Sequence, residues 1–135
     1  MIPAVIFPDA QALLIPELQA RLAANGNSAP VVSKVPKPRP AAFVQVNRTG
    51  GTKPTPVTEA VQITCDSWSD TAPAAAELAM LVRAIITDLA GTQLDSTQVY
   101  RVEEFSGAAE LPDPATGTPR YRQTFAIHLR GSSFN

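Results

Sequence analysis

Along two stretches of this chain, every second residue is apolar. This period of two is typical of a strand with one buried face and one polar face. In residues 57–66 the apolar face holds Val61, Ile63 and Cys65. In residues 120–130 it holds Tyr121, Phe125, Ile127 and Leu129, and the outward face holds Arg120, Arg122, Thr124, His128 and Arg130.

Three further stretches have the composition of strands. Residues 31–35 predict a short strand, and residues 41–48 predict another, with Phe43 and Val44 to Val46 as its apolar content. Residues 97–105 also predict a strand, but both of its faces mix apolar and charged side chains. The pattern therefore does not assign a buried face to that strand.

A first helix is predicted after Asp9, which is suited to cap the first turn. Asn25-Gly26 is a typical stop. Pro16 interrupts the pattern, either by kinking one helix or by starting a shorter helix after a separate turn at residues 9–14. We favour one kinked helix. Its apolar stripe consists of Leu14, Leu18 and Leu22.

The strongest helical pattern follows a polar turn, residues 67–71, that carries the only tryptophan. Asp70 or Thr71 can accept a hydrogen bond from a free amide of the first helical turn, and Pro73 needs no amide partner there. Gly91 is a typical helix stop. The apolar residues at helical spacing are Leu78, Leu81, Val82, Ile85 and Leu89.

The order helix, strands, helix, strands predicts an α+β fold. Strands joined by loops tend to pair antiparallel, so we expect a single antiparallel sheet of four to five strands with two helices packed on one face. The 135 residues fit a single domain, residues 1–135. Long loops are expected at about 49–56, as a projecting hairpin tip, and at 106–119, with a loose tail at 131–135.

Composition narrows the classes of function. The 11 Lys and Arg nearly balance the 12 Asp and Glu, so no overall field draws the chain to nucleic acid or to a membrane. No apolar run approaches the roughly 20 residues that span a bilayer, and no membrane partner is expected. Cys65, the single cysteine, is predicted to be a small core residue of a protein from a reducing compartment. The proline-rich residues 36–40 predict a stiff connector.

The sequence contains no pattern of catalytic residues. His128 is the single histidine, and no nucleophile motif such as Gly-x-Ser-x-Gly accompanies it. Glu103 and Glu104 are adjacent in a predicted strand, so they point to opposite faces. Phosphate-loop and dinucleotide glycine patterns are absent, and no His/Cys spacing suits zinc. We therefore expect no enzymatic activity, no cofactor and no metal.

Two features predict surfaces for other proteins. The first, here called the basic row, consists of Arg120, Arg122 and Arg130, accompanied by His128. It is suited either to an acidic neighbour or to ion pairs with Glu103 or Glu104 on a solvated strand face. The second, here called the helix patch, consists of Ala76, Met80 and Ala84 on the outer side of the second helix, where small residues permit close packing of another subunit.

The layout of the whole chain resembles a specific family. The resemblance rests on an N-terminal Pro8-Asp9 helix, a proline-rich link, a strand ending in Cys65-Asp-Ser-Trp68-Ser-Asp, an alanine-rich helix and two closing strands. In this order the chain is similar to the tail-terminator (minor tail, tail-to-head joining) proteins of long, flexible-tailed phages, and in particular to the small proteins of phages of actinobacteria.

This resemblance implies a structural protein of the virion, assembled in the host cytoplasm. Members of the family form a hexameric ring that caps the completed tail tube, ends its polymerisation and joins it to the head-completion proteins. The implied partners are further copies of the chain, the tube protein and the head-completion (connector) protein, with at most non-specific contact to DNA in the lumen. The basic row and the helix patch are candidate contact surfaces. The alternative is a small cytosolic protein- or peptide-binding module that forms no ring.

Overall fold

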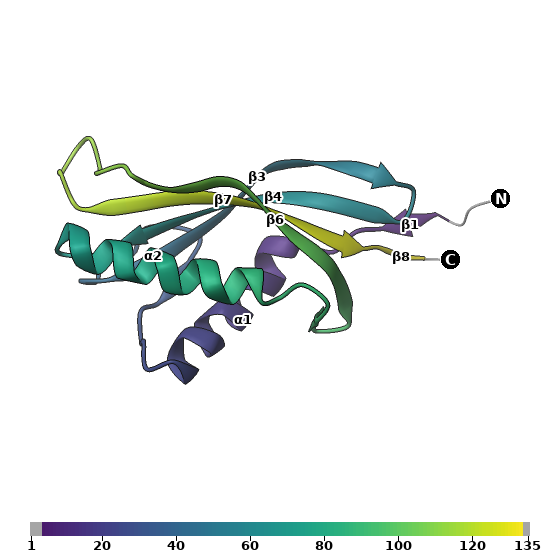
Figure 1. The fold of residues 1–135 in the computed structure, drawn as a ribbon, viewed down its shortest axis with the longest axis horizontal. Helices are drawn as coiled ribbons and strands as arrows, with labels where there is room; N and C mark the ends of the chain where they lie inside the picture. Colours follow the sequence, from purple (N-terminus) through teal and green to yellow (C-terminus); the bar gives the residue numbers. More distant parts are fainter. Residues whose placement is uncertain (1–3, 134–135) are drawn as a thin grey trace.

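The computed structural model describes residues 4–133 of the chain (Figure 1). A twisted sheet forms one layer, and two helices form the other. In chain order the elements are β1 (Val5–Ile6), α1 (Ala10–Ala24), β2 (Val31–Val32), β3 (Phe43–Thr55), β4 (Thr58–Trp68), α2 (Ala72–Thr87), β5 (Gln93–Leu94), β6 (Thr97–Glu110), β7 (Arg120–Arg130) and β8 (Ser132–Ser133).

The main sheet has six strands in the order β2-β3-β4-β7-β6-β5. Both helices lie on the same face of it, below the sheet in Figure 1. The predicted α+β class and the placement of both helices on one face are confirmed. The sheet is mainly antiparallel, and β5, a two-residue strand paired with the start of β6, is its one strand that the sequence pattern did not predict. A separate two-stranded sheet of β1 and β8 was not predicted either.

The pairing of β2 differs from the prediction, because β2 runs parallel to β3. Only Val31 and Val32 belong to β2, so the strand is also shorter than residues 31–35. The connector of residues 33–42 permits this direction, because parallel neighbours need a longer connection than a hairpin turn. This connector is held to β3 at its start, where the Ser33 carbonyl accepts hydrogen bonds from the Gln45 and Asn47 side chains at 3.3 and 3.1 Å.

The predicted loop at 49–56 is wrong, because β3 continues to Thr55 and pairs with β4 almost to the turn. The prediction of a projecting hairpin tip is confirmed (Figure 1). Gly50 and Gly51 adopt φ values of 134° and 141°, a region that favours glycine. They lie at a shift of register between Arg48 and Gly50, so the two glycines carry the strand through a bulge.

Three other predicted boundaries need correction. The loop at 106–119 is shorter, because β6 extends to Glu110. The tail at 131–135 is not loose at its start, since Ser132 and Ser133 pair with β1; residues 134–135 lie outside the described residues. The turn at 67–71 begins later, because Ser67 and Trp68 are the last residues of β4.

Bulges explain why β6 has no clean pattern of faces. Val99 lies opposite Leu129 and is buried, but register shifts follow at Val99/Arg101 and at Glu104/Ser106. Each extra residue moves the following side chains to the other face of the sheet. As a result Val102, three residues after Val99, again lies on the helix side, opposite Ile127.

The N-termini of both helices follow the predicted caps, whereas α2 ends at Thr87, before the predicted stop at Gly91. Asp9 Oδ1 accepts a hydrogen bond from the Ala12 amide at 3.1 Å, and Thr71 Oγ1 accepts one from the Ala74 amide at 3.2 Å. Helix α1 is one continuous helix with Pro16 inside it, which confirms the single-helix alternative.

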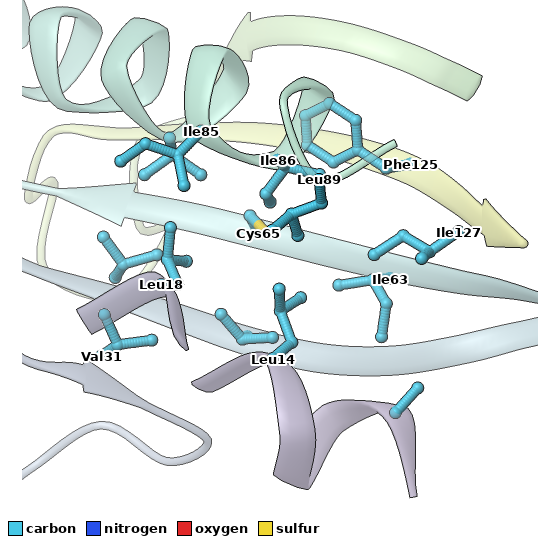
Figure 2. Packing of buried hydrophobic residues seen from close by; sticks show 14 of the residues in the cluster. Leu14, Leu18, Val31, Ile63, Cys65, Ile85, Ile86, Leu89, Phe125 and Ile127 are labelled. Carbon is cyan, nitrogen blue, oxygen red and sulfur yellow. The ribbon is translucent and has the colours of Figure 1, made fainter. Parts of the chain in front are cut away.

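The core fills the space between the helices and the sheet (Figure 2). Leu14 and Leu18 of α1 and Ile85 and Ile86 of α2 belong to one cluster with Ile63 of β4, and all five side chains are buried in the layer between the helices and the sheet. Burial of such side chains contributes about 1.5–3 kcal/mol each relative to exposure, which makes this cluster the main source of stability. Cys65 belongs to the same cluster, so its prediction as a core residue is confirmed.

Candidate functional site

The face of the sheet opposite the helices, here called the open face, carries the polar side chains of the central strands. Alternation along β7 places the basic row on this face, while Gln123, Phe125, Ile127 and Leu129 are buried under the helices. Three hydroxyls form a ladder across the open face, from Thr49 through Thr64 to Thr124, with oxygen–oxygen distances of 3.1 and 3.0 Å.

Arg122 forms a bidentate ion pair with Asp66, its direct neighbour on β4. Its Nε and Nη2 atoms donate to the two carboxylate oxygens at 2.8 and 3.0 Å. The Asp66 side chain is only 7% exposed, whereas that of Arg122 is 44% exposed. The hydrogen bonds to Asp66 raise the pKa of Arg122. Most of the Arg122 charge is therefore balanced within the subunit.

Arg120 belongs to a cluster around the only tryptophan. The Arg120 and Arg39 guanidinium groups each lie 5.0 Å from the Trp68 ring centroid, and Phe43 stacks on the same ring with centroids 5.2 Å apart. Cations over an indole ring are attracted by its π electrons. Arg120 Nε also donates to the Leu111 carbonyl at 2.8 Å. Arg120 thus ties the β6–β7 loop to the end of the sheet.

The β6–β7 loop is further fixed through Asp113. The Ala115 amide donates to Asp113 Oδ1 at 2.9 Å and lowers the pKa of Asp113, and the Thr116 hydroxyl acts in the same direction. Arg39, from the proline-rich connector, lies 3.6 Å from the Asp113 carboxylate and donates to Thr118 at 2.7 Å. Two segments far apart in sequence are joined here.

Arg130, at the other end of β7, contacts no carboxylate among the described ion pairs and donates to the Tyr100 hydroxyl at 3.0 Å. His128 Nε2 lies 2.6 Å from Glu103 Oε1, and Glu103 also pairs with Arg101 at 3.2 Å. Glu104 points to the helix side instead, where Arg83 donates to it at 2.6 and 3.0 Å.

The structure therefore does not bring the basic row together as one cationic patch. Arg120, Arg122 and Arg130 lie on one strand and one face, but each is engaged in a different local contact. Of the two interpretations left open by the sequence, local contacts on a solvated strand face describe two of these residues: His128 contacts Glu103, and Arg122 pairs with Asp66 rather than with a glutamate.

The helix patch lies on the outer side of α2, next to β6. Met80 is 44% exposed, one of the few large apolar side chains of the described residues that face solvent, and Ala84 beside it is exposed. A shallow groove between α2 and β6 has Met80, Ala84 and Val102 in its lining, and the Arg83–Glu104 ion pair crosses it. The sequence-predicted patch is thus a surface with little unbalanced charge.

The two free edges of the sheet were not predicted from the sequence. Strand β5 covers only Thr97 and Gln98 of β6, and β2 covers only Val44 and Gln45 of β3. Most of β6 and the distal half of β3 therefore lack a strand on one side within the described part of the chain. An aromatic side chain on an exposed strand, here Phe105, can indicate such an edge. Because the sequence did not assign the faces of residues 97–105, it did not show that Phe105 is exposed.

The described residues show no arrangement for metal or thiol chemistry. No group of three or more His, Cys, Asp and Glu side chains in residues 4–133 is placed to hold a metal ion. Burial raises the pKa of the Cys65 thiol well above its usual value, and the nearby Asp66 adds to this effect. Within the same residues no helix has the length and apolarity that a bilayer crossing requires.

Comparison with solved structures finds a chain of similar fold. The fold matches a chain of the virion of a native gene transfer agent particle, with a TM-score of 0.57 and 19% sequence identity, over 92% of this chain and 100% of that chain. The two chains share a fold. No protein-family model matches the sequence, and no curated protein is similar to it in sequence.

Proposed function

We propose that this chain is the tail-terminator subunit of a phage-like virion. In this role it forms a homohexameric ring on the finished tail tube, ends the addition of tube subunits and joins the tube to the head-completion proteins. The observation that carries the proposal is the shared fold, over nearly the full length of both chains, with a chain of a gene transfer agent virion. The order of sequence features quoted above supports the same conclusion.

A ring requires each subunit to present two different surfaces that meet head to tail. The fold offers such surfaces in its two unlike sheet edges and in the helix patch of Ala76, Met80 and Ala84. The ends of the sheet also differ, since the hairpin tip and the described chain ends lie at one end and the β6–β7 loop at the other (Figure 1). Two unlike ends suit a subunit with a tube side and a head side.

The charges of the open face fit a conduit for DNA better than a DNA-binding surface. Affinity for DNA grows with the number of phosphates that free Lys and Arg side chains neutralise. Here Asp66 balances Arg122, and Glu103 pairs with both Arg101 and His128. If this face lines the lumen, it attracts passing phosphates weakly and without sequence preference. A structural role of this kind requires no catalytic group and no cofactor.

The proposal is tested by adding the purified chain to tube protein of the same particle during polymerisation in vitro. We expect shorter tubes at higher chain-to-tube ratios, with a ring visible at one end of each tube by negative-stain microscopy. Tubes of unchanged length with bare ends at every ratio would contradict the proposal. The Met80→Glu variant, which is expected to remain folded but to self-associate more weakly, serves as the control and is expected to shorten the tubes less.

A further inference from the structure

We infer that the free edge of β6 in one copy pairs with the free edge of β3 in a second copy, and that Phe105 anchors this contact against the neighbour's Lys53–Pro54 segment. The inference rests on the proposed function, because a ring needs a head-to-tail contact between unlike surfaces. It names the residues that would make that contact.

The β6 edge has the properties of a strand-addition site. Beyond Gln98 no strand of the described residues pairs with its outer side, so the edge is free from Tyr100 to Glu110. Phe105 is 69% exposed, the highest value among the exposed large apolar residues, and Tyr100 on the same strand is 43% exposed. Free backbone groups beside an exposed aromatic side chain favour pairing with another strand.

The β3 edge is the corresponding free edge on the opposite side of the sheet. Beyond the residues paired with β2, the Arg48 amide donates to Gln11 Oε1 at 2.7 Å, and α1 covers the edge there. Farther along, residues 50–55 are exposed and extend into the projecting hairpin (Figure 1). Pro54 has no N–H group, so backbone pairing would end at Lys53 and leave the Pro54 ring to pack on Phe105.

The strand directions suit a head-to-tail contact. Strands β4 and β7 lie between β3 and β6, and all three neighbouring pairs are antiparallel. The two edge strands therefore run in opposite directions. A neighbour related by rotation in a ring, with its strands along the same axis, would place its β3 antiparallel to β6 and continue the alternation of the sheet.

The charges of the two edges are complementary. Glu103 lies in the exposed middle of β6 and Lys53 in the exposed distal part of β3, whereas Glu104 and Arg48 already form ion pairs with Arg83 and Glu59 inside the subunit. Glu103 is 54% exposed and so remains accessible to a second cation. A symmetric contact between two β6 edges would offer Glu103 no cation beyond Arg101, which already pairs with it on the same strand. The occupant that fits the β6 edge is therefore the β3 edge of another copy.

Cysteine pairs test the contact directly, because Cys65 is buried and engineered cysteines would be the accessible thiols. A tagged Lys53→Cys chain is mixed with an untagged Phe105→Cys chain under mild oxidation. We expect a disulfide-linked dimer with one chain of each kind. Leu111→Cys, at another exposed apolar residue just beyond the end of β6, replaces Phe105→Cys as the matched control and is expected to give little cross-linking with Lys53→Cys.

The other outcomes separate this inference from the proposed ring. If rings form but the mixed dimer does not, the inferred edge contact is wrong and the proposed ring still holds. Dimers of two Phe105→Cys chains would overturn it in favour of a symmetric contact. Absence of both the mixed dimer and any oligomer of the unmodified chain, with tube protein present as well as without it, would overturn the inference and contradict the proposed function as well.

Association of single variants gives a second measurement. Phe105→Ser is expected to weaken self-association by on the order of tenfold or more, as for loss of an interface anchor, while Leu111→Ser has little effect. Lys53→Glu is expected to weaken association, and Glu103→Lys added in the same chain to restore part of it. Equal association of Phe105→Ser and Leu111→Ser would overturn the anchor role. Trp68 fluorescence checks that each variant is folded.

Discussion

At Gly51 the first strand of the hairpin lies so close to the second that no side chain fits. A Cβ atom there would overlap the Ala60 carbonyl oxygen and lie 3.2 Å from the Gln62 nitrogen, and φ is 141°. We expect Gly51→Ala to lower the free energy of unfolding by about 1–3 kcal/mol, because the residue would be held in a strained conformation. Urea denaturation followed by Trp68 fluorescence measures the change.

Gly107 is the matched control for this substitution. A Cβ atom at Gly107 meets nothing within 4 Å, and its φ is not in the left-handed region. Gly107→Ala is expected to raise the free energy of unfolding by less than about 1 kcal/mol, because alanine reduces the conformational entropy of the unfolded chain. Equal destabilisation by the two substitutions would show that close approach at Gly51 is not the cause.

The Arg122–Asp66 pair predicts a strong coupling between two residues. Arg122→Ala would leave the nearly buried Asp66 carboxylate without its two hydrogen bonds. We expect a loss of about 1–3 kcal/mol in the free energy of unfolding, the cost of an unsatisfied group. The double variant Asp66→Ala/Arg122→Ala is expected to lose less than the sum of the two single variants. Additive losses in urea denaturation would contradict a direct pair.

At the scale of elements, the periodic segments were predictable from the sequence and the boundaries were not. The period of two in β4 and β7 survives in the structure because both strands are central and one of their faces is buried. In β6 the bulges near Arg101 and Ser106 change the faces, so no single period describes the strand. Gly50 and Gly51 have the composition of a loop, yet here they extend a strand.

The helix patch leads to a prediction at the same scale. Met80→Glu places a charge in the exposed groove between α2 and β6, where Arg83 and Glu104 already neutralise each other. Because this side chain packs into no core, the variant is expected to remain folded, while desolvation of the new carboxylate weakens self-association by on the order of tenfold. Light scattering across a concentration series measures the association.

Ala23→Glu, at another exposed helix residue away from the groove, is the control for this variant. It is expected to associate as the unmodified chain does. Unchanged association of Met80→Glu would remove the helix patch from the subunit contact. The sheet edges would then remain as candidate contacts.

At the scale of the whole molecule, the α+β class and the side of the sheet that the helices cover followed from amphipathic patterns. The parallel direction of β2 did not, since it depends on a connector that carries no periodic signal. The placement of Arg120, Arg122 and Arg130 on one face was also predictable from alternation. Their separate partners, including Asp66 and the Trp68 ring, were not, because those contacts depend on strand register.

The proposed function requires that copies of this chain close into a ring. The most direct test is the mass of the purified protein in solution by size exclusion with light scattering, followed by negative-stain images of the largest species. We expect a species of about 86 kDa, six times the 14.3 kDa chain, that appears as closed sixfold rings. A protein that stays monomeric at every concentration, alone and with its tube protein present, would contradict the account and favour a small binding module.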